Sequence, residues 1–174
     1  MAVTVKPTAN ACAFVVGDDG LARWSDLHAD AWVGLLEAAK RLTRALDAEL
    51  EAEHGLSLSA LEILGRLAAA EQRRMRLSAV ASATGLSLSR VSRVVDVLER
   101  RKLVKRVACP SDARAVEAHL TRSGLTLARQ AQATHFASVE KQFFDQLSAD
   151  ELRTLADVFG RFAPRAAAAC DANG

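Results

Sequence analysis

Residues 87–101 combine serine hydroxyls and arginine guanidinium groups with valines and leucine. In a helix, this spacing places the hydroxyls and guanidinium groups on one face and the valines and leucine on the other. Arginine can donate two hydrogen bonds to O6 and N7 of guanine, and both arginine and serine bind phosphate. We therefore interpret the segment as a DNA recognition helix.

The polar residues of this segment have different expected roles. Arg90 and Arg93 lie in the first turns, where side chains can reach base edges, and Arg90 is the preferred candidate for reading a base. The alternative for both arginines is a phosphate contact. A hydroxyl discriminates poorly between bases, so Ser87, Ser89 and Ser92 are expected to contact phosphate or to cap the helix.

The preceding residues predict a helix-turn-helix. Residues 77–84 have a short apolar pattern that ends at Gly85, which can take a positive φ in a tight turn. Ala81 is small enough for a close helix crossing, and Val91 and Val94 can fill that crossing. The alternative is an ordinary pair of antiparallel helices in a bundle, which would also use a glycine turn.

The distribution of charge favours nucleic acid as the partner. Residues 73–114 carry eleven Lys or Arg and three Asp or Glu, a net charge of +8, whereas the 174-residue chain has a net charge of only +2. A basic segment between acidic flanks is typical of a nucleic-acid-binding surface. Within it, Arg73, Arg74 and Arg76 could line the path of the phosphates or form a solvated charged surface.

Composition predicts a mainly helical protein of the reducing cytoplasm. Alanine and leucine dominate, only 5% of residues are aromatic, and tyrosine is absent. The three cysteines are far apart and no apolar run is long enough for a membrane span, so we expect neither a disulfide framework nor a membrane partner. The histidines are scattered and no catalytic motif is present, so no enzyme, cofactor or metal site is expected.

Hydrophobic spacing and turn residues divide the chain further. Residues 1–24 are expected to form an arm with a turn at residues 17–20, and residues 25–54 a helix long enough for a subunit interface. Ser59 and Glu62 are interpreted as a capping box that opens the next helix.

The C-terminal third predicts two strands and two helices. Residues 103–108 and 115–120 are predicted strands around a Pro-Ser-Asp turn, so they would form a β-hairpin. Thr121 would cap a helix that reaches about residue 146. Ser148 and Glu151 form a second predicted capping box, followed by a helix to residue 163 and a tail over 164–174.

This order of elements resembles the multiple-antibiotic-resistance regulator (MarR) family of winged helix-turn-helix transcription factors. The resemblance spans roughly residues 25–163 and is carried by 86–99, by Leu-Val-Lys-Arg at 103–106, by Asp-Ala-Arg at 112–114 and by Leu120, Thr121 and Gly124. It implies a mainly α fold with a DNA-binding lobe at about 57–121 and dimerisation helices at about 25–54 and 122–163. The implied protein is a ligand-responsive repressor that binds a near-palindromic double-stranded DNA operator as a homodimer.

Two details of the wing and of the residue that follows the recognition helix can be added. Arg114 at the hairpin tip could enter the adjacent minor groove, with Asp112 orienting it or shaping the turn. The alternative is a solvated tip with an incidental ion pair. Family members usually have glycine where this chain has Lys102, so this lysine is expected to adopt a left-handed conformation at a cost of about 1 kcal/mol.

The resemblance also implies an effector, a small aromatic or phenolic anion. Trp32, Glu62, Arg106 and Arg114 match positions of a urate-responsive branch of the family. Glu62 already has a predicted role in its capping box, and Trp32 could instead belong to the core or the dimer contact. A redox- or metal-responsive regulator of the same fold, and a helical module whose basic face binds an acidic protein, remain the alternatives.

Overall fold

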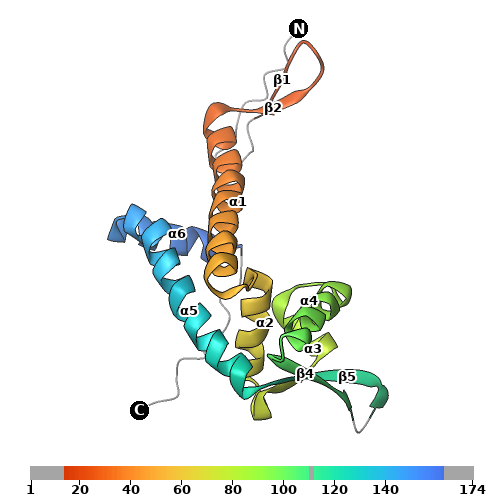
Figure 1. The fold of residues 1–174 in the computed structure, drawn as a ribbon. Helices are drawn as coiled ribbons and strands as arrows, with labels where there is room; N and C mark the ends of the chain where they lie inside the picture. The colour runs from red at the N-terminus through yellow and green to blue at the C-terminus, as the bar shows by residue number, and fades with distance from the viewer. Residues whose placement is uncertain (1–13, 110–111, 163–174) are drawn as a thin grey trace. The chain divides into compact units, whose positions relative to one another are not determined.

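The computed structural model describes residues 14–109 and 112–162, and of residues 112–115 it describes only the backbone. The chain forms two units, Met1–Ala45 and Leu46–Gly174. Most described residues are helical (Figure 1), with one sheet of two strands and one of three. Within the described part, no helix is long and apolar enough to cross a membrane.

The first unit contains a hairpin and most of a long helix. Strands β1 (Phe14–Val16) and β2 (Ala22–Trp24) pair in antiparallel orientation around the predicted turn, where Gly20 has a φ of 75°. The turn is thus confirmed, although the two strands were not predicted. The Arg23 guanidinium holds the pKa of the Asp19 carboxyl below its usual value. Helix α1 (Asp26–His54) matches the predicted long helix.

The core of the second unit joins three helices to a sheet. Helices α2 (Leu58–Ala69), α3 (Leu77–Thr84) and α4 (Leu88–Arg100) pack with strand β5 (Asp112–Leu120) and with α5 (Arg122–Gln142). The fully buried large side chains are Leu50, Leu56, Ile63, Leu64, Leu67, Val80, Val91, Val95, Leu98 and Val104. This apolar core fixes the position of α4.

The start of α2 corrects one prediction. Ser57, not Ser59, is the N-cap, and its hydroxyl accepts a hydrogen bond from the Ala60 amide. The Asp47 carboxylate accepts a second hydrogen bond from the Leu58 amide, with an N···O distance of 2.7 Å. Together they satisfy two amides of the first turn, so the predicted capping box of Ser59 and Glu62 does not form.

The helix-turn-helix is confirmed. Gly85 ends α3 with a φ of 68°, a left-handed conformation that glycine adopts without a steric penalty. Ser87 then caps α4, its hydroxyl accepting a hydrogen bond from the Arg90 amide. Val91 is fully buried at the crossing, with Ala81 and Val94 packed against the core.

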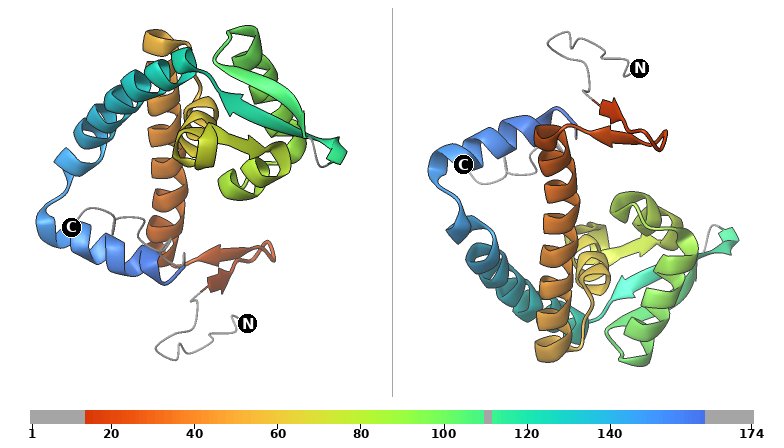
Figure 2. Two further views of the ribbon diagram at one scale, coloured as in Figure 1. Left: turned by 90° about the horizontal axis from the view of Figure 1, so that it is seen from below. Right: turned by 90° about the horizontal axis from the view of Figure 1, so that it is seen from above.

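The hairpin predicted after α4 belongs to a sheet of three strands. Strand β4 (Val104–Cys109) pairs with β5, and β5 pairs on its other edge with β3 (Arg74–Arg76), giving the order β3-β5-β4. The first strand was not predicted. Figures 1 and 2 show that the β4–β5 hairpin extends beyond α3 and α4 as a wing.

Hydrogen bonds and one close backbone contact fix the residues between α4 and β4 against the start of α5. Lys102 has a φ of 60°, as predicted for this position, and the Leu103 amide donates to the Leu98 carbonyl. Thr121 caps α5, accepting from the Gly124 amide and donating to the Leu103 carbonyl. An added Cβ at Gly124 would lie 2.1 Å from the Leu103 carbonyl oxygen, so only glycine fits.

Two helical segments complete the second unit. Helix α5 ends at Gln142, and the rest of its predicted length is a 3-10 turn, Phe144–Gln146. Helix α6 (Ala149–Gly160) starts with the predicted capping box, in which hydrogen bonds from Ser148 hold the pKa of Glu151 below its usual value. The predicted tail lies outside the described residues.

Candidate nucleic-acid interface

The two faces of α4 differ as expected. Val91, Val95 and Leu98 are buried, whereas Arg90 and Arg93 are exposed. The Arg93 guanidinium makes no hydrogen bond or ion pair with any residue that the structure describes. The Arg90 guanidinium instead donates to the Ser59 hydroxyl of α2, with an N···O distance of 3.4 Å. Arg93 is therefore the arginine presented on the open side of the helix, while Arg90 lies on the side of α2.

The serines at the start of α4 are partly occupied by contacts within the protein. The Ser87 hydroxyl caps the helix and is 3.1 Å from the Ser89 hydroxyl. The Ser92 hydroxyl accepts a hydrogen bond from Arg106 at 3.1 Å. The predicted capping role is thus confirmed for Ser87, and Ser92 lies on the side of α4 that faces the wing.

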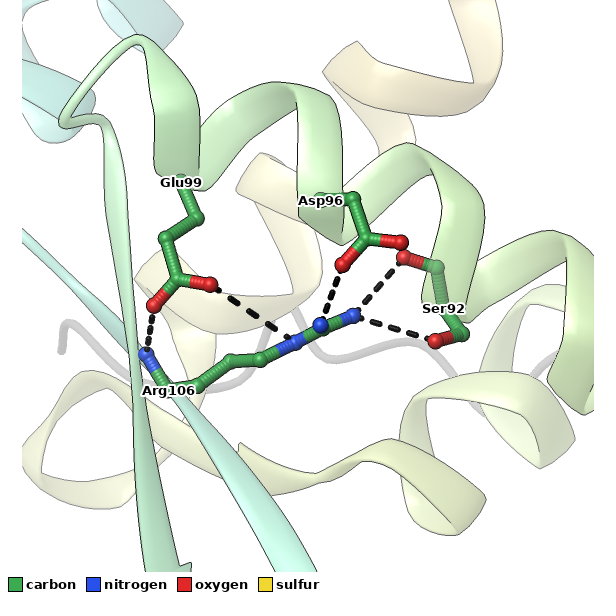
Figure 3. A network of polar contacts seen from close by, with 4 residues as sticks. All are labelled: Ser92, Asp96, Glu99 and Arg106. Atoms are coloured by element: carbon green, nitrogen blue, oxygen red, sulfur yellow. Dashed lines mark hydrogen bonds and ion pairs between the residues drawn. The ribbon is translucent and has the colours of Figure 1, made fainter.

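Arg106 joins the wing to the recognition helix (Figure 3). From β4, its Nη2 donates to the backbone carbonyl of Ser92 at 2.8 Å, and its Nη1 pairs with the Asp96 carboxylate. The Glu99 carboxylate accepts from the Arg106 backbone amide at 2.8 Å. Three residues one turn apart on α4 therefore hold one arginine of the strand.

This network is half-buried, so its hydrogen bonds are expected to stabilise the fold. Hydrogen bonds to charged groups contribute about 1.5–3 kcal/mol when water is partly excluded, and the Arg106 side chain is 25% exposed. Its Nε is buried without a hydrogen bond, with the nearest Glu99 oxygen 4.0 Å away. The network restrains the wing on the same helix that presents Arg93.

Replacing Arg106 with alanine should therefore lower the free energy of unfolding by about 1–3 kcal/mol, because Asp96 and Ser92 lose their partner. Urea denaturation followed by circular dichroism would measure this change. Lys105→Ala is the matched control, since Lys105 is exposed on the same strand and should change stability by less than about 0.5 kcal/mol. Equal losses of unfolding free energy in the two variants would contradict the proposal that Arg106 restrains the wing on α4.

The basic residues before α3 are not equivalent. The exposed guanidinium of Arg73 makes no hydrogen bond or ion pair with the described residues. Its backbone amide donates to the Ala70 carbonyl, and its φ of 55° is left-handed. Arg74 lies 3.9 Å from the Glu117 carboxylate on β5, and Arg76 donates to the Cys109 thiol at 3.4 Å. Arg74 and Arg76, which belong to the basic segment 73–114, thus also make contacts within the sheet.

The wing residues Asp112 and Arg114 lie in β5, where Asp112 is paired with Cys109. Their side chains fall outside what the structure describes. The minor-groove role of Arg114 and the orienting role of Asp112 therefore stay predictions.

Sequence reasoning did not identify a role for Arg101. Its guanidinium donates to the carbonyl oxygens of His54, at 2.9 Å, and of Gly55, at the C-terminus of α1. A cation is favourable there because the last carbonyls of a helix lack partners. One arginine of the basic segment therefore ties α4 to the end of α1.

Glu62 and Arg106, two of the proposed effector residues, do not line the same cavity. Glu62 lines an open cavity of about 740 Å³ between α2 and α5, whereas Arg106 is held against α4 and does not line it. Trp32 belongs to the first unit, and its effector role stays a prediction. Arg129 and His135 of α5 also line the cavity, and the buried Nδ1 of His135 has no hydrogen-bond partner among the described residues. Neither of these two residues was predicted.

Comparisons with known proteins give a consistent result. Residues 54–115 match a model of the MarR family. AbsC, a MarR family transcriptional regulator from Streptomyces coelicolor, is 37% identical, with a TM-score of 0.74 over 82% of this chain and 96% of that one. Sco3205 from the same organism, crystallised in complex with DNA, is 30% identical, with a TM-score of 0.73 over 80% and 88%.

A third structure shares the fold alone. It is a mutant of MarR from E. coli complexed with operator DNA, which is 22% identical, with a TM-score of 0.66 over 80% of this chain and 100% of that one. No curated protein matches the chain significantly.

Proposed function

The chain belongs to the MarR family of transcriptional regulators, and from this premise we propose that it is a homodimeric repressor that reads a near-palindromic operator. In each subunit, α4 would enter the major groove and the β4–β5 wing would reach the adjacent minor groove. The observation that carries this proposal is the open face of α4, where Arg93 is exposed beside a wing braced by Arg106.

Exposed apolar residues support the dimer. In the first unit, the α1 residues Trp32 and Val33 are 53% and 51% exposed, and in the second unit Phe136 and Phe162 are 61% and 82% exposed. A monomer rarely exposes contiguous patches of large apolar side chains. Burial against a second copy would remove this surface from water.

A salt titration tests the DNA-binding proposal. Operator affinity, measured by fluorescence anisotropy with a labelled duplex, should fall steeply and linearly on a plot of log K against log salt concentration, because bound phosphates release counterions. Random duplex should bind at least about 1,000-fold more weakly. Affinity for an acidic protein with none for nucleic acid would favour the protein-interaction alternative.

We further propose that the α2–α5 cavity binds the effector, an aromatic anion. Arg129 supplies the positive charge, Phe136 an aromatic surface, and the unpartnered His135 Nδ1 a polar contact. Binding there would shift the spacing of the two recognition helices and release the operator. Glu62 on the same wall would select against a second negative charge in the ligand.

Salicylate and benzoate are suitable probes for this cavity. Each should raise the melting temperature of the protein by mass action, and Arg129→Gln should abolish that increase. Arg153→Gln is the control, because Arg153 is exposed on α6, does not line the cavity and pairs with Asp150. An equal increase for the wild type and the Arg129 variant would contradict this effector site.

A further inference from the structure

We propose that Leu88 is a specificity-determining residue that recognises the C5-methyl group of thymine, an inference that rests on the proposed DNA-binding role of α4. Leu88 is the first residue of the helix, and 53% of its surface is exposed. The buried apolar residues of α4, Val91, Val95 and Leu98, all lie in the core. Leu88 therefore contributes little to that core.

The two serines that flank Leu88 are poor candidates for distinguishing bases. The Ser87 hydroxyl accepts a hydrogen bond from the Arg90 amide, and the Ser87 and Ser89 hydroxyls bond to each other at 3.1 Å. Hydroxyls can also rotate to suit either a donor or an acceptor, so they discriminate weakly. A leucine side chain cannot adapt in this way.

Leu88 lies on the side of α4 that faces the wing. Residues four apart share a helix face, so Leu88 lies one turn before Ser92, whose hydroxyl and carbonyl bind Arg106 of β4. In a helix-turn-helix, the N-terminal residues of the recognition helix contact base edges in the major groove. Leu88 would therefore meet a base edge there.

The chemistry of the base edges selects thymine. In the major groove, thymine alone presents a methyl group, whereas the edges of adenine, guanine and cytosine present donors or acceptors. Leucine offers those polar edges no hydrogen bond and would displace water from them. Contact with a methyl group instead buries apolar surface on both sides, which contributes about 0.8 kcal/mol per carbon, a factor of about four in affinity.

Replacing thymine with deoxyuridine removes this methyl group and leaves the hydrogen-bonding edge unchanged. In an operator selected with the full-length wild-type protein, each thymine would be replaced singly. At one position in each half-site, deoxyuridine should weaken wild-type binding about fourfold. The Leu88→Ala variant should bind the thymine duplex and the deoxyuridine duplex equally at that position. The effects of the base replacement and of the Leu88 substitution should therefore not be additive.

Val97→Ala is the matched control. Val97 is also an exposed apolar residue of α4, 45% exposed, but it lies more than two turns farther along the helix. This variant should keep the wild-type sensitivity to deoxyuridine at the Leu88-dependent thymine.

Each outcome decides the proposal. Loss of the deoxyuridine effect in Leu88→Ala at one thymine per half-site supports the role of Leu88. Specific binding by the wild type with no sensitivity to deoxyuridine anywhere, or the same sensitivity in Leu88→Ala, would overturn the role of Leu88 and leave DNA binding intact. If the wild type selects no sequence at all, the proposed function fails, and the role of Leu88 fails with it.

Discussion

Replacing Arg93 with alanine should weaken operator binding by about 30-fold or more. Each bidentate contact between arginine and guanine contributes about 1–3 kcal/mol of discrimination, and the dimer would make two of them. Arg93 is exposed on the open face of α4 without an intramolecular partner in the described residues. Anisotropy titrations against the operator and against random duplex would measure the change.

Two further variants separate base readout from simple charge. Arg93→Lys keeps the charge but loses the planar pair of donors, so it should retain binding to random duplex and lose selectivity. Arg90→Ala should have the smaller effect, because the Arg90 guanidinium lies on the side of α2, near Ser59. If Arg93→Ala weakened all sequences equally, Arg93 would be a phosphate contact, and Arg90 would again be the preferred base reader.

Replacing Gly124 with alanine should lower the free energy of unfolding by about 3 kcal/mol. The new Cβ would meet the backbone carbonyl of Leu103 at 2.1 Å and a methyl group of Leu120 at 2.9 Å. Overpacking of this kind forces a backbone shift and typically costs about 1–3 kcal/mol, occasionally more. Here the obstructing atom belongs to the backbone, which also accepts hydrogen bonds from Thr121.

Gly65→Ala is the matched control for this substitution. Gly65 also lies inside a helix, but a Cβ there would have no neighbour within 4 Å. Alanine favours the helix over glycine, so this variant should gain up to about 1 kcal/mol. Urea denaturation distinguishes the two expectations by sign. A loss at Gly65 as large as that at Gly124 would show that space around the glycine is not the cause.

Local signals explain why the helix-turn-helix could be predicted. Gly85, the cap at Ser87 and the buried Val91 all depend on neighbours a few residues away, and the structure confirms each of them. The left-handed Lys102 was predicted from the family pattern and is also confirmed. Charge likewise identified the basic segment that contains α4.

Other features depend on partners distant in the sequence. Ser57 and Ser59 are two residues apart and both could cap a helix, but Asp47 binds the Leu58 amide, and this contact accompanies a start at Ser57. Strand β3 has only three residues, and its pairing with β5 spans about forty residues. No local pattern contains either contact.

The contacts of Arg106 and Arg90 likewise depend on residues that are distant in the sequence. Arg106 was assigned to an effector site by resemblance, but its partners on α4 become visible only when β4 is folded beside that helix. Sequence spacing likewise ranked Arg90 above Arg93, whereas the structure places Arg90 near Ser59. The sequence identifies which side chains can bind DNA, and tertiary packing determines which of them remain available.

The central claim is that two copies of α4 read one two-fold site. Selection from a library of randomised duplexes by the full-length protein tests it most directly. We predict enrichment of a near-palindromic sequence whose half-sites have centres about 10 base pairs apart, one turn of the double helix. Recovery of sequences without any common motif, or of a single unrepeated half-site, would contradict the account.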